Sequence, residues 1–125
     1  MFVLCLAGLG SRFIDVGIHR PKYLLPTKSG LPILSSIIKQ VSFPGNELVM
    51  LVLNNRHTSY QSEVVSALKK TTNNYSLHYI DDTSGQAETA KIAAKLALAE
   101  FPESSGKPIL FHNGDTILLN RNIKA

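Results

Sequence analysis

Cysteine, tryptophan and long hydrophobic runs are scarce or missing in this sequence. Cys5 is the single cysteine among 125 residues, so no disulfide bond can form within the chain. Its apolar neighbours predict a small buried side chain. The apolar segment at residues 2–9 is too short to cross a membrane, and no basic residues precede it as they would in a secretory signal. We therefore expect a cytoplasmic protein that does not bind a membrane.

Charge of one sign is not concentrated anywhere in the chain. The sequence holds 13 Lys and Arg residues against 9 Asp and Glu residues, a formal net charge of +4, and the basic residues are scattered. Without a basic run or a basic stripe with interleaved aromatic residues, nucleic acid is not an expected partner. A modest positive charge suits a smaller anionic ligand such as a nucleotide. The histidines have no zinc-like spacing, and we interpret most of them as surface or loop residues.

What is present is an alternation of apolar and amphipathic segments. With 44% hydrophobic residues the chain can fill one core, and we expect residues 1–125 to form a single domain. Apolar runs predict strands at residues 2–6, 48–53, 77–80 and 109–111. Amphipathic segments predict helices between them, and the last helix is expected to turn a small-residue face to the sheet, made by Ala87, Ala90, Ala94, Ala97 and Phe101. Strands alternating with helices predict a three-layer α/β/α sandwich around a mostly parallel sheet.

The loops that follow the predicted strands carry most of the notable residues. In a parallel α/β sheet, ligands bind beyond the carboxyl ends of the strands. Residues 8–22, 81–88 and 113–115 leave those ends, and we expect them to converge in space. The edges of so short a sheet are open to pairing with another chain, which makes association into a homo-oligomer an expected property.

Glycines and basic residues share the first of these loops. The first strand is followed directly by Gly8-Leu9-Gly10-Ser11-Arg12, and glycines allow backbone N–H groups to approach phosphate oxygens closely. Phe13 occupies the third glycine position of a dinucleotide-binding loop, and no Gly-Lys-Ser/Thr follows as in a Walker A loop. A tight turn without a ligand is the alternative. Further on, Pro21 and Pro26 predict a stiff extended segment that holds Lys22 in place.

Together these segments resemble the signature of the nucleotidyltransferase superfamily, which includes the sugar-1-phosphate nucleotidyltransferases. The resemblance rests on Leu6-Ala7-Gly8-Leu9-Gly10-Ser11-Arg12-Phe13, followed by Pro21-Lys22 and Leu24-Leu25-Pro26. It implies a glycosyltransferase-A-like fold. It also implies that Arg12 and Lys22 are catalytic residues on the phosphates. The nucleotide-binding residues implied by this part of the resemblance are Leu6, Ala7, Gly8, Gly10, Ser11, Arg12 and Lys22.

Two further loops are similar to motifs of the same superfamily. Gly85 and Gln86 match a glycine-rich helix start that reads the nucleobase. Thr83 and Gln86 also fit a helix capping box, and one glutamine side chain cannot serve both roles at once. Asp115, in Asn113-Gly114-Asp115, matches a Gly-Asp whose carboxylate binds Mg²⁺, an ion that prefers carboxylate and phosphate oxygens. A polar turn that ends a strand is the alternative interpretation of this segment.

The function implied by the resemblance is transfer of an NMP group from an NTP to a sugar 1-phosphate or a similar phosphorylated small molecule, with release of pyrophosphate. Such an enzyme serves nucleotide-sugar or surface polysaccharide synthesis. Members of the superfamily typically continue beyond the Gly-Asp with strands that bind the acceptor, so we expect a truncated form of the fold. The alternative is a nucleotide-binding module without catalysis. A dinucleotide-dependent oxidoreductase is disfavoured because Asn54-Asn55, and not an acidic residue, end the second apolar run.

The substitution Asp115→Asn is expected to weaken Mg²⁺-dependent nucleotide binding and to leave the fold intact, because the amide lacks the negative charge that would hold the ion. Titration calorimetry on the parent and the variant, with and without Mg²⁺, measures the effect. The metal assignment is wrong if the parent protein binds nucleotide equally tightly with and without the ion.

Overall fold

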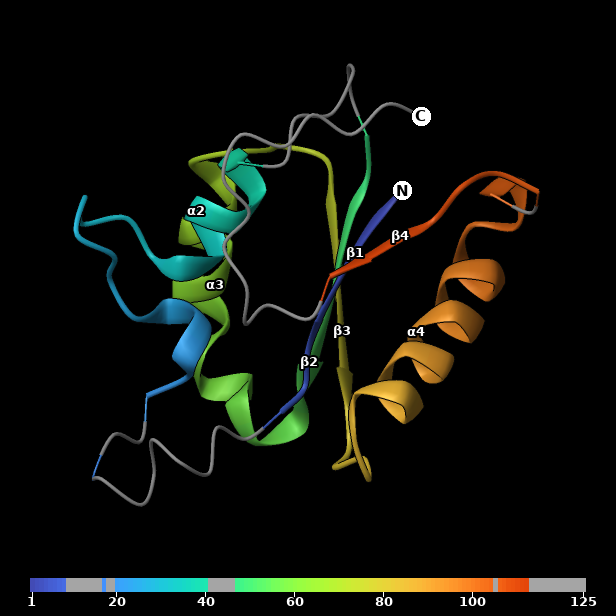
Figure 1. Ribbon diagram of the computed structural model, residues 1–125, viewed down its shortest axis with the longest axis horizontal. Helices are drawn as coiled ribbons and strands as arrows, with labels where there is room; N and C mark the ends of the chain where they lie inside the picture. The colour runs from blue at the N-terminus through green and yellow to red at the C-terminus, as the bar shows by residue number, and fades with distance from the viewer. Residues whose placement is uncertain (9–16, 18–19, 41–46, 105, 113–125) are drawn as a thin grey trace.

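The computed structural model describes residues 1–8, 17, 20–40, 47–104 and 106–112 as three layers (Figure 1). A sheet of four parallel strands forms the middle layer, in the order β3-β2-β1-β4. Helices α2 and α3 cover one face of the sheet and α4 covers the other. The strands are β1 (Phe2–Leu6), β2 (Val49–Asn54), β3 (Tyr75–Ile80) and β4 (Leu110–His112), and the helices are α2 (Ile33–Gln40), α3 (Gln61–Lys69) and α4 (Gln86–Glu100). The predicted α/β/α sandwich with a parallel sheet is confirmed.

The two central strands are apolar along their whole length because both of their faces are covered. Phe2 of β1 pairs with Val49 of β2 and with Leu110 of β4, and the pairing with β2 continues to Leu6 and Leu53. All six residues of β2 are buried, as expected for a central strand of a parallel sheet. The apolar run therefore located these strands correctly.

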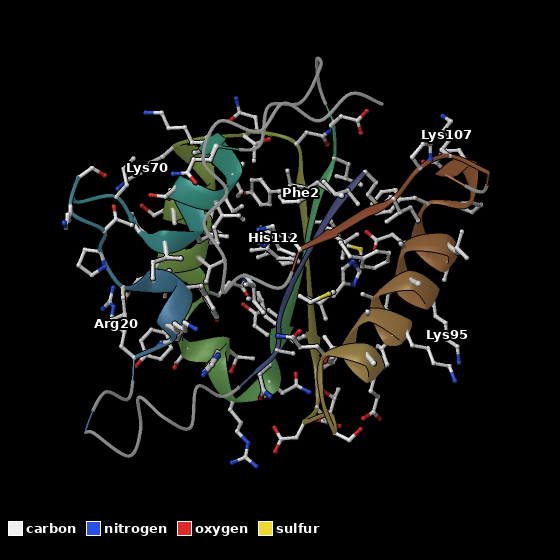
Figure 2. The ribbon with its side chains drawn as sticks, viewed as in Figure 1. Phe2, Arg20, Lys70, Lys95, Lys107 and His112 are labelled. Atoms are coloured by element: carbon white, nitrogen blue, oxygen red, sulfur yellow. The ribbon has the colours of Figure 1, made fainter. Side chains whose placement is uncertain are left out.

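Of the two outer strands, β3 differs more from the prediction than β4 does. All six residues of β3, which lies at one edge of the sheet, are half-buried. This strand begins at Tyr75, two residues before the apolar run that predicted it, because an edge strand accepts polar residues such as Ser76. At the other edge, β4 is placed on β1 partly by His112, whose ring meets the ring of Phe2 edge-on with centroids 6.0 Å apart (Figure 2).

Each face of the sheet has a hydrophobic core of its own. On the α2 and α3 face, large side chains interlock, among them Phe2, Leu4, Leu34, Ile37, Leu51, Val64 and Leu68. On the α4 face, Val3, Met50 and Val52 pack against Ala93 and Ala97. Alanines let the helix axis approach the sheet closely, since no bulky side chain separates them. Cys5, predicted to be buried, is partly buried against this second core.

The small-residue face predicted for α4 is wrong in part. The buried residues are Thr89, Ala93 and Ala97, at a spacing of four, whereas Ala87 is exposed in the first turn. Ala90 and Ala94 are only half-buried, so the buried stripe of the helix is rotated by about one residue from the predicted one. The far end of α4 is attached to the edge strand, because Glu100 accepts a hydrogen bond from Ser76 at 3.1 Å and pairs with His78 at 2.5 Å.

None of the helices in the described residues is long and apolar enough to cross a membrane.

Replacing Ala93 by leucine is expected to destabilise the fold by about 1–3 kcal/mol, since the added atoms would push α4 away from the sheet. Ala93 is 0% exposed against Val3 and Met50. The matched control is Ala99→Leu on the exposed side of the same helix, which should change stability by about 0.5 kcal/mol or less. Urea denaturation followed by circular dichroism measures both. Equal losses in the two variants would contradict the observed packing of α4.

Candidate functional site

The carboxyl ends of β1, β2 and β3 lie at one edge of the sheet, the lower edge in Figure 1. Ala7 and Gly8 follow β1 there, Asn54 ends β2, and Asp81 and Asp82 follow β3. The loops at residues 8–22 and 81–88 leave the sheet at this edge, as expected, while residues 9–16 and 18–19 of the first loop lie outside the described residues. The third loop, residues 113–115, lies outside the described residues.

The side chain of Asn54 joins these strand ends. Its Nδ2 group donates to the carbonyl oxygen of Ala7 and to Oδ1 of Asp82, each at 2.9 Å. Its Oδ1 accepts from the backbone N–H of Arg56, also at 2.9 Å, and so caps the 3-10 helix that follows β2. Asn54 is 1% exposed, so these bonds replace water completely. Moving Ala7 or Asp82 away would leave a buried N–H group of Asn54 without an acceptor, which is unfavourable, so Asn54 holds both in place.

Charged groups also hold the start of the loop at residues 81–88. Arg56 donates to Asp82 through its guanidinium group, with a shortest distance of 2.8 Å. Asn55 donates to Asp81 Oδ1 at 2.7 Å. The hydrogen bond from Asn54, followed by the one from Arg56, lowers the pKa of Asp82, which therefore stays negative at neutral pH. The Arg56–Asp82 pair is largely exposed and contributes little to stability by itself.

The start of α4 is capped differently from the predicted capping box. Gly85 is the N-cap and makes no side-chain cap, and Gln86 is exposed. Instead, the backbone N–H and the hydroxyl of Ser84 both donate to the carboxylate of Glu88, at 2.5 and 2.7 Å. These bonds lower the pKa of Glu88. The box of Thr83 and Gln86 is therefore wrong, because Glu88 supplies a charged acceptor that a glutamine cannot match.

Thr83 serves the same turn from its other side. Its hydroxyl meets the hydroxyl of Thr89 at 2.7 Å, and Thr89 in turn donates to the carbonyl oxygen of Gly85 at 3.1 Å. The turn is thus fixed by Ser84, Thr83 and two residues of the first helical turns. Gln86 takes no part in it, so its amide is not committed to capping.

Both glycines of the described site face open space. A Cβ atom built on Gly8 or Gly85 meets no described atom within 4 Å. Packing between protein groups therefore does not require glycine at either position. The side chains of Leu6 and Ala7 point into the core, at 5% and 4% exposed, so only their backbone groups can reach a ligand.

Lys22 begins a short 3-10 helix, Lys22–Leu24, and not the continuous extended segment that the two prolines predicted. Pro21 has extended backbone angles before this turn and Leu25 has them after it, so the prolines act only on the flanks. The side chains of Tyr23 and Leu24 are buried, which anchors the turn on the α2 and α3 side. Lys22 itself is half-buried.

A buried histidine supports this turn. The hydroxyl of Tyr23 lies 3.3 Å from Nδ1 of His57, and the ring of His57 also meets that of Tyr60 edge-on, with centroids 6.3 Å apart. His57 and His112 are each only 9% exposed, so the interpretation of the histidines as surface residues fails for these two. The sequence does not indicate that His57 is buried, because its partner Tyr23 lies far from it in the chain.

Several predicted site residues lie outside the described residues, namely Gly10, Ser11, Arg12 and Asp115. Their roles remain predictions. In the part of the chain that the structure describes, no three His, Cys, Asp or Glu side chains gather in a way that could hold a metal ion. The most informative residue that sequence reasoning missed is Asn54. The signal for it in the sequence is an amide at the end of a wholly apolar run, a position that by itself argues only against a dinucleotide site.

Comparison with known proteins gives a match at the level of fold. No protein-family model matches the sequence, and no curated protein matches it. Among solved structures, a nucleoside-diphosphate-sugar pyrophosphorylase from Vibrio cholerae RC9 superimposes with a TM-score of 0.72 and 22% sequence identity. The chain shares its fold with that pyrophosphorylase. The match covers 99% of this chain and 51% of the other, so the chain spans about half the length of the matched structure.

The stability of the protein should depend on His57 in mildly acidic solution. Burial lowers the pKa of His57 below its ordinary value of 6.5, so the unfolded chain binds more protons than the folded one between the two values. The contribution of the neutral ring is complete above the ordinary value and is lost as the pH falls through the lowered pKa. Asp82 and Glu88 have ordinary values of 3.8 and 4.5 that are also lowered, so they act below this window.

We therefore expect the free energy of unfolding to fall more steeply from about pH 7 to about pH 5.5 in the parent than in His57→Gln. Denaturant titrations at closely spaced pH values give the two curves. Their difference removes the contribution of the other histidines, which both proteins share. Parallel curves would show that His57 is not held in its neutral form.

Proposed function

We propose that this chain is the nucleotide-binding part of a nucleotidyltransferase, which transfers an NMP group from an NTP to a sugar 1-phosphate or a similar phosphorylated small molecule. The observation that carries the proposal is the position of the glycine-rich signature. It starts at Ala7 and Gly8, immediately after central strand β1, at the same edge of the sheet as the loop with Gly85 and Gln86. Ligands of parallel α/β sheets bind at that edge. The shared fold with a nucleoside-diphosphate-sugar pyrophosphorylase supports the same conclusion.

The proposed reaction is an in-line displacement at the α-phosphorus of the NTP. A phosphate oxygen of the acceptor forms a bond to that phosphorus, the bond to the bridging oxygen of the β-phosphate breaks, and pyrophosphate leaves with the electron pair. No covalent intermediate with the protein is needed. Catalysis then consists of holding the reacting atoms in line and stabilising the charge that develops on the leaving group.

Each signature residue has a proposed part in this step. Backbone N–H groups of Gly8, Gly10 and Ser11 surround the phosphates, and the open space beside Gly8 in the structure suits such an approach. Arg12 stabilises the triphosphate and the departing pyrophosphate. Lys22 holds the α-phosphate, and the buried anchor formed by Tyr23 would keep its backbone in place.

Base recognition is proposed for the second loop. Gln86 is exposed at the start of α4 and is free of the cap, so its amide can pair with a base edge. The open space beside Gly85 lets a planar base lie against the backbone. Gly85 and Gln86 thus form the proposed base side of the site.

Mg²⁺ is the proposed cofactor, and Asp115 is the residue proposed to hold it. A carboxylate is the right donor for this ion, which would neutralise charge on the phosphates when bound. Asp115 lies outside the described residues, so the proposal rests on its sequence motif.

A second candidate function is a nucleotide-binding module without catalysis of its own. The match covers 51% of the pyrophosphorylase, so the activity of that whole protein enters here only as a proposal, and nucleotide binding without transfer is the alternative to test. In either case we propose a cytoplasmic protein that binds NTP, has no nucleic acid or membrane partner, and can associate with further copies of itself.

Arg12→Ala is expected to lower turnover by roughly 10²–10³, the size of effect seen when one transition-state donor is lost. The assay is Mg²⁺-dependent release of pyrophosphate by the full-length natural protein, given each common NTP with a panel of sugar 1-phosphates and phosphocholine. The matched control is Lys70→Ala. Lys70 is an exposed cation after α3, away from the carboxyl edge of the sheet (Figure 2).

The control separates a local role from a general loss of positive charge. Turnover within about threefold of the parent in Arg12→Ala would remove Arg12 from the proposed mechanism. Nucleotide binding without pyrophosphate release, with every acceptor tested, would favour the non-catalytic module.

A further inference from the structure

Asn54 connects two loops that the backbone of the sheet does not connect. Strands β1 and β3 each pair with β2 and not with one another, so no ladder hydrogen bond links their ends. The carboxamide of Asn54, at the end of the intervening strand, reaches Ala7 on one side and Asp82 on the other. Ala7 immediately precedes Gly8 in the proposed phosphate loop, and Asp82 lies three residues before Gly85 in the proposed base loop.

The geometry of this link leaves no freedom to the amide. Both N–H groups of Nδ2 are used, one for each loop, and Oδ1 is used by the backbone N–H of Arg56. At 1% exposed, the group has no water to exchange these partners with. A shift of one loop relative to the other would therefore break a buried hydrogen bond, which is unfavourable in a way that a surface bond is not.

We propose that Asn54 is a positioning residue that fixes the distance between the phosphate loop and the base loop, and thereby sets the selectivity for the nucleobase. The inference rests on the proposed function. A nucleoside triphosphate joins its base and its phosphates covalently, so the two loops must stand at a matching separation to hold both ends. Base selectivity needs short, directed hydrogen bonds and is lost when the groups that make them are displaced.

The pair Asn54 and Asp82 can be separated from its neighbours by mutation. Asp82→Ala removes the acceptor at the base loop, and the exposed position of Asp82 makes loss of the fold improbable as the cause of an effect. Asn54→Ala removes both links. Arg56→Ala is the matched control, because it removes the exposed ion pair to Asp82 and leaves the two bonds donated by Asn54 in place.

The measurement is the affinity of the 125-residue chain for ATP, CTP, GTP and UTP, and for pyrophosphate, by titration calorimetry. Selectivity is the ratio between the best and the second-best nucleotide. We expect Asn54→Ala and Asp82→Ala to lower this ratio by up to about 10-fold, the size of effect that the loss of one directed hydrogen bond to the base has on affinity. Pyrophosphate contacts the phosphate loop alone, so its affinity should change by less than about threefold in Asp82→Ala.

A rescue experiment distinguishes positioning from a purely structural role. Asn54→Asp combined with Asp82→Asn exchanges donor and acceptor, so the amide at position 82 can donate to the carboxylate at position 54, while the bond to the Ala7 carbonyl oxygen is not restored. Selectivity should recover in part relative to Asn54→Asp alone, where two carboxylates face each other. Unfolding midpoints of all variants are measured in parallel, so that changes in selectivity are compared at known stability.

Each outcome decides the matter. The inference is supported if selectivity falls in Asp82→Ala and Asn54→Ala but not in Arg56→Ala. It is overturned if the ratio stays within about twofold of the parent in both, or if Arg56→Ala has as large an effect, since the ion pair and not the amide would then act. If the parent chain binds no nucleotide at all, the proposed function fails and this inference fails with it. Binding by the parent with unchanged selectivity in the variants rejects the inference alone.

Discussion

The parallel pairing of β1 with a strand on each side is the constraint on which the rest of the structure depends. Phe2 lies between Val49 and Leu110, so β1 is enclosed by β2 and β4, and its faces are covered by helices. Parallel pairing obliges every connection to cross over the sheet, which places helices on both faces. It also brings the ends of all strands with the same polarity to one edge. That the loops after β1, β2 and β3 start at one edge is thus a consequence of topology before any particular residue is considered.

The two faces of the sheet contribute differently to that edge. On the α2 and α3 side, large side chains and the Tyr23–His57 contact hold the turn that carries Lys22. On the α4 side, alanines bring the helix close, and Gly85 and Gln86 stand at its N-terminus. Asn54 stands between these two halves and bonds to both of the loops described. Buried, hydrogen-bonded groups therefore support the start of each loop, while the space beside Gly8 and Gly85 stays open.

The sequence predicts those features of the fold and the candidate site that depend on neighbouring residues, and it misses those that depend on residues far apart in the chain. The apolar run of β2 predicts a strand buried on both faces, because the whole signal lies in consecutive residues. The start of α4 was assigned to the wrong pair because two local rules competed, and the charged Glu88 displaced Gln86 as partner of the turn. The roles of Asn54 and His57 depend on Ala7, Asp82 and Tyr23, which are distant in sequence. No period or spacing reveals such pairs until the strand order is known.

The position of β1 between β2 and β4 also affects the order in which the strands can pair during synthesis. A ribosome makes β1 first and β4 close to the end of the described chain, so the strand that needs two partners waits longest for the second. Strands β1, β2 and β3 can assemble with α2 and α3 while the β4 side of β1 is still unpaired. An apolar strand with one free edge is a template for any other extended chain nearby. Pairing with another nascent chain at this edge would therefore compete with completion of the sheet, and the competition grows with the concentration of such chains.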